Sequence, residues 1–358
     1  MAGQMNLGTV LVKLLLDDGQ FGPDLKKAEA ALSKFGAKAV DLAESLDKML
    51  TRAFMTAGAA IAGVGTAAVV TGAAFEKQMS KVQAVAQATA PELAALTAEA
   101  RRIGSETLFS ATEAAQGMEA LAQAGFTPRQ IITATADAMN LAGASGMELG
   151  AATETVAATL TQFGLTAEDA GRASDVLTQA ASSSLFTVQD LAVALRYAGS
   201  AGAAMGFSLE ETTAAVAQFR NMGLTGEMAG TNFRAMLEAI ANPTNKARDA
   251  IEALGLKVDD LNPTMHGFDE IMQTLSDHNL DVASSFKIFG QVSGANVARL
   301  ASLWEDAKKK QTGYSQTLKA LMTSQGVSAA QFAQMADNVA GKFDVMSSSI
   351  EEALLTVF

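Results

Sequence analysis

The residue types that could support catalysis are few and widely separated in this sequence. The two histidines, His266 and His278, lie outside any HExxH pattern and away from a serine nucleophile motif. The segment AGSAG at residues 198–202 misses the GxSxG nucleophile elbow at its first glycine, and Gly341-Lys342 lacks the upstream glycine of a phosphate-binding loop. The chain contains no cysteine, which excludes disulfides and thiolate ligands. We therefore expect no catalytic residue, no cofactor and no metal site, and a protein that is not an enzyme.

Two further patterns have simpler structural explanations. The carboxylate pairs Glu168-Asp169 and Glu210-Glu211 fall in the first turns of expected helices, where the helix dipole favours negative charge. Residues 63–68 fit a loose GxGxxA dinucleotide pattern, but neither a preceding strand nor the required acidic residue accompanies it.

A net charge of −12 and a run without lysine from Arg101 to Ile240 would repel a phosphate backbone, so we expect no sequence-specific binding of nucleic acid.

The elements around these residues are expected to be helical. Alanine-rich composition with 17 Met and 5 Pro favours closely packed helices over sheets. Within residues 76–242, a short pattern recurs about every 40 residues, at 125–130, 164–169 and 206–211. Each copy offers a glycine that closes one helix, an apolar anchor, a Ser or Thr N-cap and an acidic or amide residue in the next first turn. This core domain is predicted to be a series of stacked helical hairpins.

Two more helix starts, at residues 109–113 and 186–190, follow the same pattern. A longer echo pairs Phe109 with Phe186 and Phe126 with Phe207, and suggests a doubled four-helix block. In the same echo, Asn140, Gly146 and Gly150 match Asn221, Gly226 and Gly230. The residues that define the core-domain motif are Phe109, Ser110, Glu113, Gly125, Phe126, Phe163, Gly164, Phe207, Ser208, Gly223 and Gly226.

The segments before the core have three different patterns. Residues 1–22 are predicted to form one short β-strand, 10–16, and a turn. Residues 23–52 keep a three/four alternation of apolar positions, which predicts a coiled-coil helix or an amphipathic helix packed on its own domain. The seam consists of Leu25, Ala28, Leu32, Phe35, Ala39, Leu42, Leu46 and Met49.

Residues 53–75 carry no charge over a length that would span a bilayer, although Ala, Gly and Thr dominate them. Either a helix buried against other helices or a conditional membrane segment fits this composition. The residues concerned include Gly58, Ile61, Gly63, Val64, Gly65, Val69 and Val70.

After the core, residues 243–326 are predicted to be a helical extension that folds back on the hairpins. Residues 327–358 show a second three/four alternation and are expected to begin a long coiled-coil-like helix. The apolar run at 354–358 suggests a fragment or a truncated gene product. The overall expectation is an all-α fold of stacked hairpins flanked by long helices, with one N-terminal strand.

Residues 75–86, 109–126, 160–181 and 195–237, in this order and spacing, closely resemble the core domain of tape-measure proteins from long-tailed bacterial viruses. The resemblance covers most of the chain, which is shorter than the usual member. It implies a structural protein of the virion that lies inside the tail tube, sets tail length during assembly in the host cytoplasm, and leaves ahead of the genome at infection.

The implied partners are further copies of the chain, as a trimer or higher oligomer, with tail-tube, tube-end or baseplate-hub proteins, tail assembly chaperones and, on ejection, the host membrane. Two other functions also fit the sequence patterns: a membrane-active, holin-like pore, and a soluble helical-repeat scaffold that recruits partners.

Overall fold

The computed structural model describes residues 61–310, 313–337, 341, 344–345, 347–349, 351–352 and 355, with the backbone alone for 61–70 and 308. Every regular element within these residues is a helix, which confirms the all-α prediction. The N-terminal strand and the heptad segment lie outside the described residues. The chain divides into compact units at 1–67 and 68–358, and the second unit contains the hairpin core.

α3 (Ile61–Ala86) leads into the hairpin core and continues unbroken through residues 75 and 76, between which the sequence predicts a domain boundary. The helices that follow are α4 (Ala90–Glu106), α5 (Ala111–Gln123), α6 (Pro128–Ser145), α7 (Leu149–Phe163), the 3-10 turn η1 (Ala167–Asp169), α8 (Ala170–Ser183), α9 (Val188–Ala204), α10 (Leu209–Asn221) and α11 (Gly226–Ala241).

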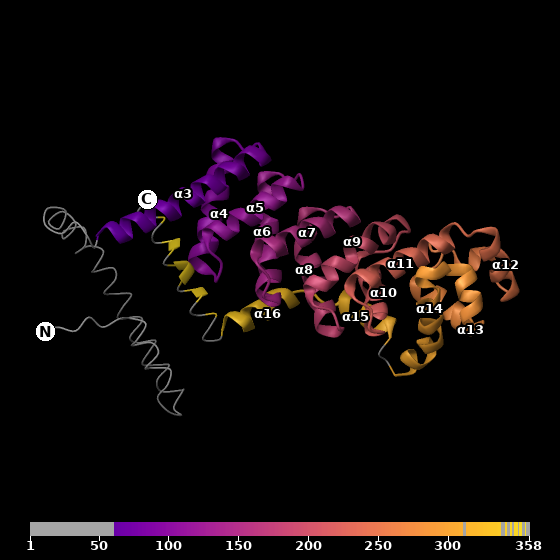
Figure 1. Cartoon of the computed structure of the whole chain (residues 1–358). Helices are drawn as coiled ribbons and strands as arrows, with labels where there is room; N and C mark the ends of the chain where they lie inside the picture. Colours follow the sequence, from indigo (N-terminus) through magenta and orange to yellow (C-terminus); the bar gives the residue numbers. More distant parts are fainter. Residues whose placement is uncertain are drawn as a thin grey trace, which may run out of the picture. The chain divides into compact units, whose positions relative to one another are not determined.

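From α4 to α11 these helices form two rows, because α4 to α9 each pack on the helix two positions further along the chain. One row contains α5, α7, α9 and α11, and the other contains α4, α6, α8 and α10 (Figure 1). Consecutive helices such as α5 and α6, or α9 and α10, pack across the rows. One continuous cluster of buried apolar side chains runs between the rows, with Ala at many positions where helices approach closely. The predicted stacking of helical hairpins is therefore present.

The extension after the core forms a smaller bundle at the α11 end of the rows. It consists of α12 (Asn245–Ala253), η2 (Val258–Leu261), α13 (Phe268–Asp277) and α14 (Val282–Lys309). α14 is broken at Gly290, which has φ 72° and ψ −169°, so two helical pieces follow one another there. Both α12 and α13 pack on α14, and α14 packs on α11.

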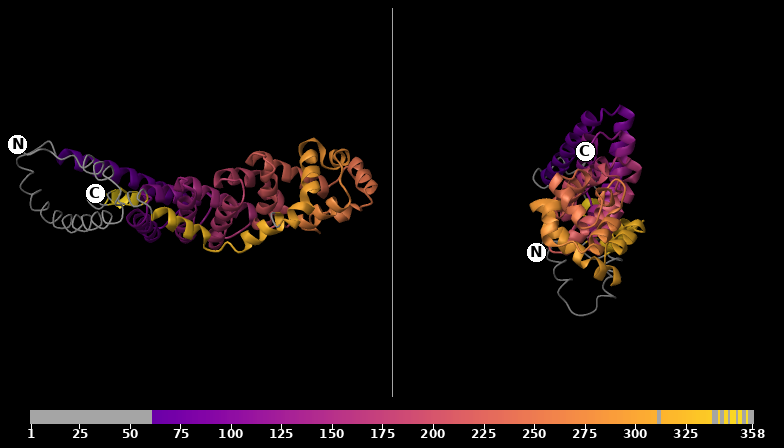
Figure 2. Two further views of the ribbon diagram at one scale, coloured as in Figure 1. Left: turned by 90° about the horizontal axis from the view of Figure 1, so that it is seen from below. Right: turned by 90° about the vertical axis from the view of Figure 1, so that its right-hand side faces the viewer.

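The C-terminal segment then returns along the row of even-numbered helices. α15 (Tyr314–Met322) packs on α10 and α8, and α16 (Val327–Ala336) packs on α8 and α6. Figures 1 and 2 both show this segment beside the core helices. α16 ends at Ala336, with Asp337 as its C-cap, so it is shorter than the helix expected from residue 327. We call residues 314–352 the return segment.

Among the described residues, no helix combines the length and apolarity needed to cross a bilayer. α3 contains the second part of the uncharged segment, but it continues into Glu76, Lys77 and Lys81. The membrane reading of residues 53–75 therefore gains no support from the structure of α3, and residues 53–60 lie outside the described part.

Candidate functional site

Side chains cap the helix N-termini of the stack, and the N-terminus of α5, here called its entry, shows this capping most fully. The Ser110 hydroxyl accepts a hydrogen bond from the Glu113 backbone N–H at 3.2 Å, and the Glu113 carboxylate accepts one from the Ser110 N–H at 2.8 Å. This reciprocal capping box satisfies two amides that a helix start leaves unpaired. Phe109, just before the cap, is 5% exposed and anchors the entry in the core. The three residues act as the sequence predicts.

A second entry, at α9, repeats the hydrogen bonds that precede the cap at α5, without the reciprocal capping box. Thr107 donates its hydroxyl to the Ile103 carbonyl and accepts from the Phe109 N–H, and Ser184 makes the same two bonds with Ala180 and Phe186. Thr187 then caps α9 by accepting from the Asp190 N–H at 3.0 Å. Equivalent helix entries therefore recur where the sequence echo pairs Phe109 with Phe186.

The three hairpin turns also match the predicted pattern. Gly125, Gly164 and Gly206 have φ values of 87°, 62° and 89°, in the left-handed region that side chains disfavour. Each is followed by a cap residue of the next helix, Thr127, Thr166 or Ser208. Phe207 is buried, whereas Phe126 and Phe163 are partly buried against the core. Gly223 (φ 95°) makes the corresponding turn before α11.

The glycines that the sequence echo pairs, Gly146 with Gly226 and Gly150 with Gly230, have different surroundings in the structure. A Cβ atom on Gly226 would lie 2.3 Å from the Asp190 carbonyl oxygen, and one on Gly230 would lie 2.2 Å from that of Ala194. These two glycines therefore let α11 approach the α9 backbone. Gly146 instead closes α6 with φ 70°, and nothing lies within 4 Å of a Cβ on Gly150. Gly146 and Gly150 therefore have other structural roles than Gly226 and Gly230, with which the sequence echo pairs them.

The return segment is held by a buried carboxylate on α8. Asp175 accepts hydrogen bonds from the Gly326 N–H at 2.7 Å, the Ser328 N–H at 2.9 Å and the Ser328 hydroxyl at 2.6 Å. Gly326 and Ser328 flank the first residue of α16, so Asp175 caps a helix more than 140 residues further along the chain.

Two more contacts extend this attachment along the core. Phe332 of α16 lies over Gly143 of α6, where a Cβ would overlap the phenyl ring, and its ring centroid is 6.0 Å from that of Phe109. Further on, Arg101 of α4 pairs with Glu352 at 2.7 Å, and Ser348 donates to the Thr107 carbonyl. The return segment therefore touches the core from α10 to α4.

Two carboxyls have raised pKa values, Asp137 of the core and Glu351 of the return segment. Burial, and then the nearby charge of Asp175, raise the pKa of Asp137 on α6, opposed by a hydrogen bond from the Gly171 amide. Burial also raises the pKa of Glu351, with Glu113 and Glu352 adding to it and a bond from Thr112 opposing it. Both sites favour the neutral acid, which is typical of half-buried carboxyls beside other carboxylates.

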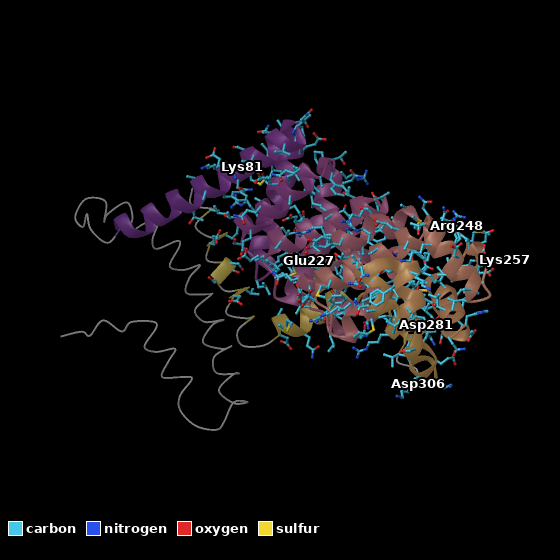
Figure 3. The ribbon with its side chains drawn as sticks, turned by 45° about the vertical axis from the view of Figure 1, so that its right-hand side comes forward. Lys81, Glu227, Arg248, Lys257, Asp281 and Asp306 are labelled. Carbon is cyan, nitrogen blue, oxygen red and sulfur yellow. The ribbon has the colours of Figure 1, made fainter. Side chains whose placement is uncertain are left out.

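The residues considered for catalysis have structural partners. His266 lies 3.0 Å from Glu270, one turn along the chain, and His278 Nδ1 lies 2.9 Å from the Leu254 carbonyl oxygen. In the described part of the chain, no group of three or more His, Asp or Glu side chains could hold a metal ion. Charged side chains such as Arg248, Lys257 and Asp281 are distributed over the helical surface around α12–α14 (Figure 3).

Other predicted site residues lie outside the described residues, or where only the backbone is described. The whole heptad seam, Leu25 to Met49, and Gly58 lie outside the described residues. Ile61, Gly63, Val64, Gly65, Val69 and Val70 lie in the first turns of α3, where the backbone alone is described. Sequence reasoning missed Asp175, Ser328 and the pairing of Phe332 with Gly143, because no local pattern marks contacts between such distant segments.

Repeated capped hairpins, closed by the chain's own C-terminal segment, define an α-helical scaffold. Family comparison extends this description: the model for "Phage-related minor tail protein" matches residues 97–294, from within α4 into α14. The match covers more than half of the chain, which therefore belongs to the family of phage-related minor tail proteins.

Two curated relatives extend the similarity. The chain is 31% identical over 362 residues to the tape measure protein of Pneumococcus phage Dp-1, covering 99% of this chain and 31% of that protein. It is 29% identical over 306 residues to the probable tape measure protein of Escherichia phage P2, covering 82% of this chain and 37% of the relative. The chain thus spans about a third of their length. No solved structure matches it significantly.

Proposed function

We propose that this chain is all or part of a phage tail tape-measure protein, a non-catalytic component of the tail-tube lumen that sets tail length and leaves ahead of the genome. The observation that carries the proposal is the coincidence of the family match, residues 97–294, with the hairpin stack. Similarity to two proteins named as tape measures supports the same role.

In this proposal the stack is an assembly module and the heptad segment 23–52 joins copies of the chain as a trimer or higher oligomer. Tube-end or baseplate-hub proteins and tail assembly chaperones are the proposed partners, with assembly in the bacterial cytoplasm. Insertion of residues 53–75 into the host membrane belongs to the ejection step of the proposal. The heptad pattern supports the oligomer, since a strict 3.5-residue period favours supercoiled helices.

The test is a nonsense mutation in the gene, complemented from a plasmid, with tail lengths measured by negative-stain electron microscopy. We expect tails to be absent or irregular in length without the protein and uniform after complementation. Antibodies against residues 97–294 should bind after triggered ejection and fail to bind intact virions. Normal tails without the protein, or an epitope exposed on intact tails, would refute the proposal.

A further inference from the structure

A small pocket lies between α13, α14 and the start of α15, away from the return-segment contacts with α6 and α8. Its volume is about 100 Å³, and Asp269, Trp304, Gly313, Tyr314 and Ser315 contribute to its lining. Sites for cofactors and drug-sized ligands usually measure about 300–1,000 Å³. The pocket is therefore of a size for one side chain rather than for a cofactor.

The walls combine aromatic surface with negative charge. Trp304 and Tyr314 are 4% and 3% exposed, and their ring centroids are 6.1 Å apart. Phe268 packs behind them, 5.7 Å from Trp304 and 5.1 Å from Tyr314. Burial, and then the charges of Glu211 and Asp269, raise the pKa of Tyr314. The lining residues include no basic side chain to balance these carboxylates.

One buried polar atom at this site has no partner. The indole Nε1 of Trp304 makes no hydrogen bond in the structure, although a buried donor without an acceptor is unfavourable. The Asp269 carboxylate accepts one long bond, from the Ser315 hydroxyl at 3.4 Å, and retains further acceptor capacity. The pocket thus offers an acidic acceptor with spare capacity, whereas Trp304 Nε1 is itself buried.

We propose that this pocket binds a lysine or arginine side chain of an extended peptide segment from another protein. The cationic head would pair with Asp269, and the apolar stem would lie along the aromatic wall, as basic side chains do at amphipathic surfaces. Charge complementarity selects a basic residue over an acidic or apolar one, and this inference holds independently of the role in the tail.

Trp304 is the single tryptophan of the chain, so its fluorescence reports on the pocket directly. The full chain should be titrated with acetyl-Gly-Gly-Arg-Gly-Gly-amide, its Lys version, and versions with norleucine or Glu at the central position. We expect a saturable change in fluorescence with the Arg and Lys peptides, and their binding should weaken with added salt. The norleucine and Glu peptides should bind at least threefold more weakly.

Variants then test whether the Asp269 carboxylate binds the basic side chain. Asp269→Asn should weaken the binding of the Arg peptide about three- to fivefold, whereas Asp269→Glu should keep the preference for a basic side chain. Asp249→Asn, an exposed carboxylate on α12 outside the pocket, is the matched control and should leave binding unchanged. The absence of a saturable response, equal responses to Arg and norleucine, or equal losses in Asp269→Asn and Asp249→Asn would overturn the proposal. If Asp269→Asn does not fold, the peptide series on the native chain decides.

Discussion

Asp175 and Ser328 are joined by two hydrogen bonds, at 2.9 Å to the serine amide and 2.6 Å to its hydroxyl, although 153 positions separate them in the chain. Both residues are buried. Since Asp175 also accepts from the Gly326 amide, one side chain on α8 satisfies two backbone donors at the start of α16. The attachment of the return segment to the even row therefore depends strongly on a single carboxylate.

Replacing that carboxylate should loosen α16 while leaving the hairpins folded. Asp175→Ala leaves the Gly326 amide and the buried Ser328 amide and hydroxyl without their acceptor, and we expect a loss of about 1–3 kcal/mol for local opening. Asp175→Asn retains one carbonyl oxygen and should lose less. The measurement is amide hydrogen exchange of residues 327–336, with α9 as the internal reference. Glu154→Ala, an exposed site on α7, is the control; unchanged protection of α16 in Asp175→Ala would contradict the assignment.

The raised pKa of Asp137 predicts a stability effect that depends on pH. Because the folded pKa lies above that of the unfolded chain, the native state is destabilised by the charged form, and this penalty is fully present at a pH above the folded pKa. Asp137→Asn should therefore raise the urea midpoint at pH 7. The gain should vanish as the pH falls below about 4, where the native carboxyl is protonated. A lower midpoint at pH 7, or a difference independent of pH, would contradict the cause given for the shift.

The glycines of α11 predict a contrast between two alanine substitutions. Gly230→Ala places a Cβ 2.2 Å from the Ala194 carbonyl oxygen, so α11 must move away from α9, at a cost of about 1–3 kcal/mol. Gly150→Ala meets nothing within 4 Å and should be neutral or slightly stabilising, because alanine favours helix over glycine. Urea unfolding of both variants checks this. Equal effects would show that α9 and α11 are not held in close contact.

The sequence predicted those parts of this fold that depend on neighbouring residues. Ser110 and Glu113 cap a helix across three positions, and Gly125 ends one helix two positions before the next cap, so both roles can be read locally. Asp175 looks like any acidic residue in a helix, because its partners are reached only after the chain has turned back. Glycine roles show the same limit: Gly146 and Gly226 share a place in the echo, but tertiary contact alone distinguishes a helix end from a close approach.

The ion pair between Arg172 and Glu210 tests whether charge links α8 to α10. Arg172 Nε and Nη2 each lie 2.7 Å from a different oxygen of Glu210, a two-bond geometry that fixes both side chains. Glu210 is 8% exposed in its side chain and Arg172 46%. Removing the arginine therefore leaves a buried carboxylate unpaired, whereas part of the pair's attraction is already screened by water.

Arg172→Ala should lower the free energy of unfolding by about 1–2 kcal/mol, less than the 3–5 kcal/mol typical of breaking a fully buried pair. Arg172→Ala combined with Glu210→Gln should cost less than Arg172→Ala alone, because the remaining amide carries no charge to desolvate. Arg196→Ala, an exposed arginine on α9 without an ion pair among the described contacts, is the control and should change stability by less than about 0.5 kcal/mol. If the double variant is the less stable of the two, then Glu210 has favourable contacts besides Arg172, and the link between α8 and α10 is not carried by this pair.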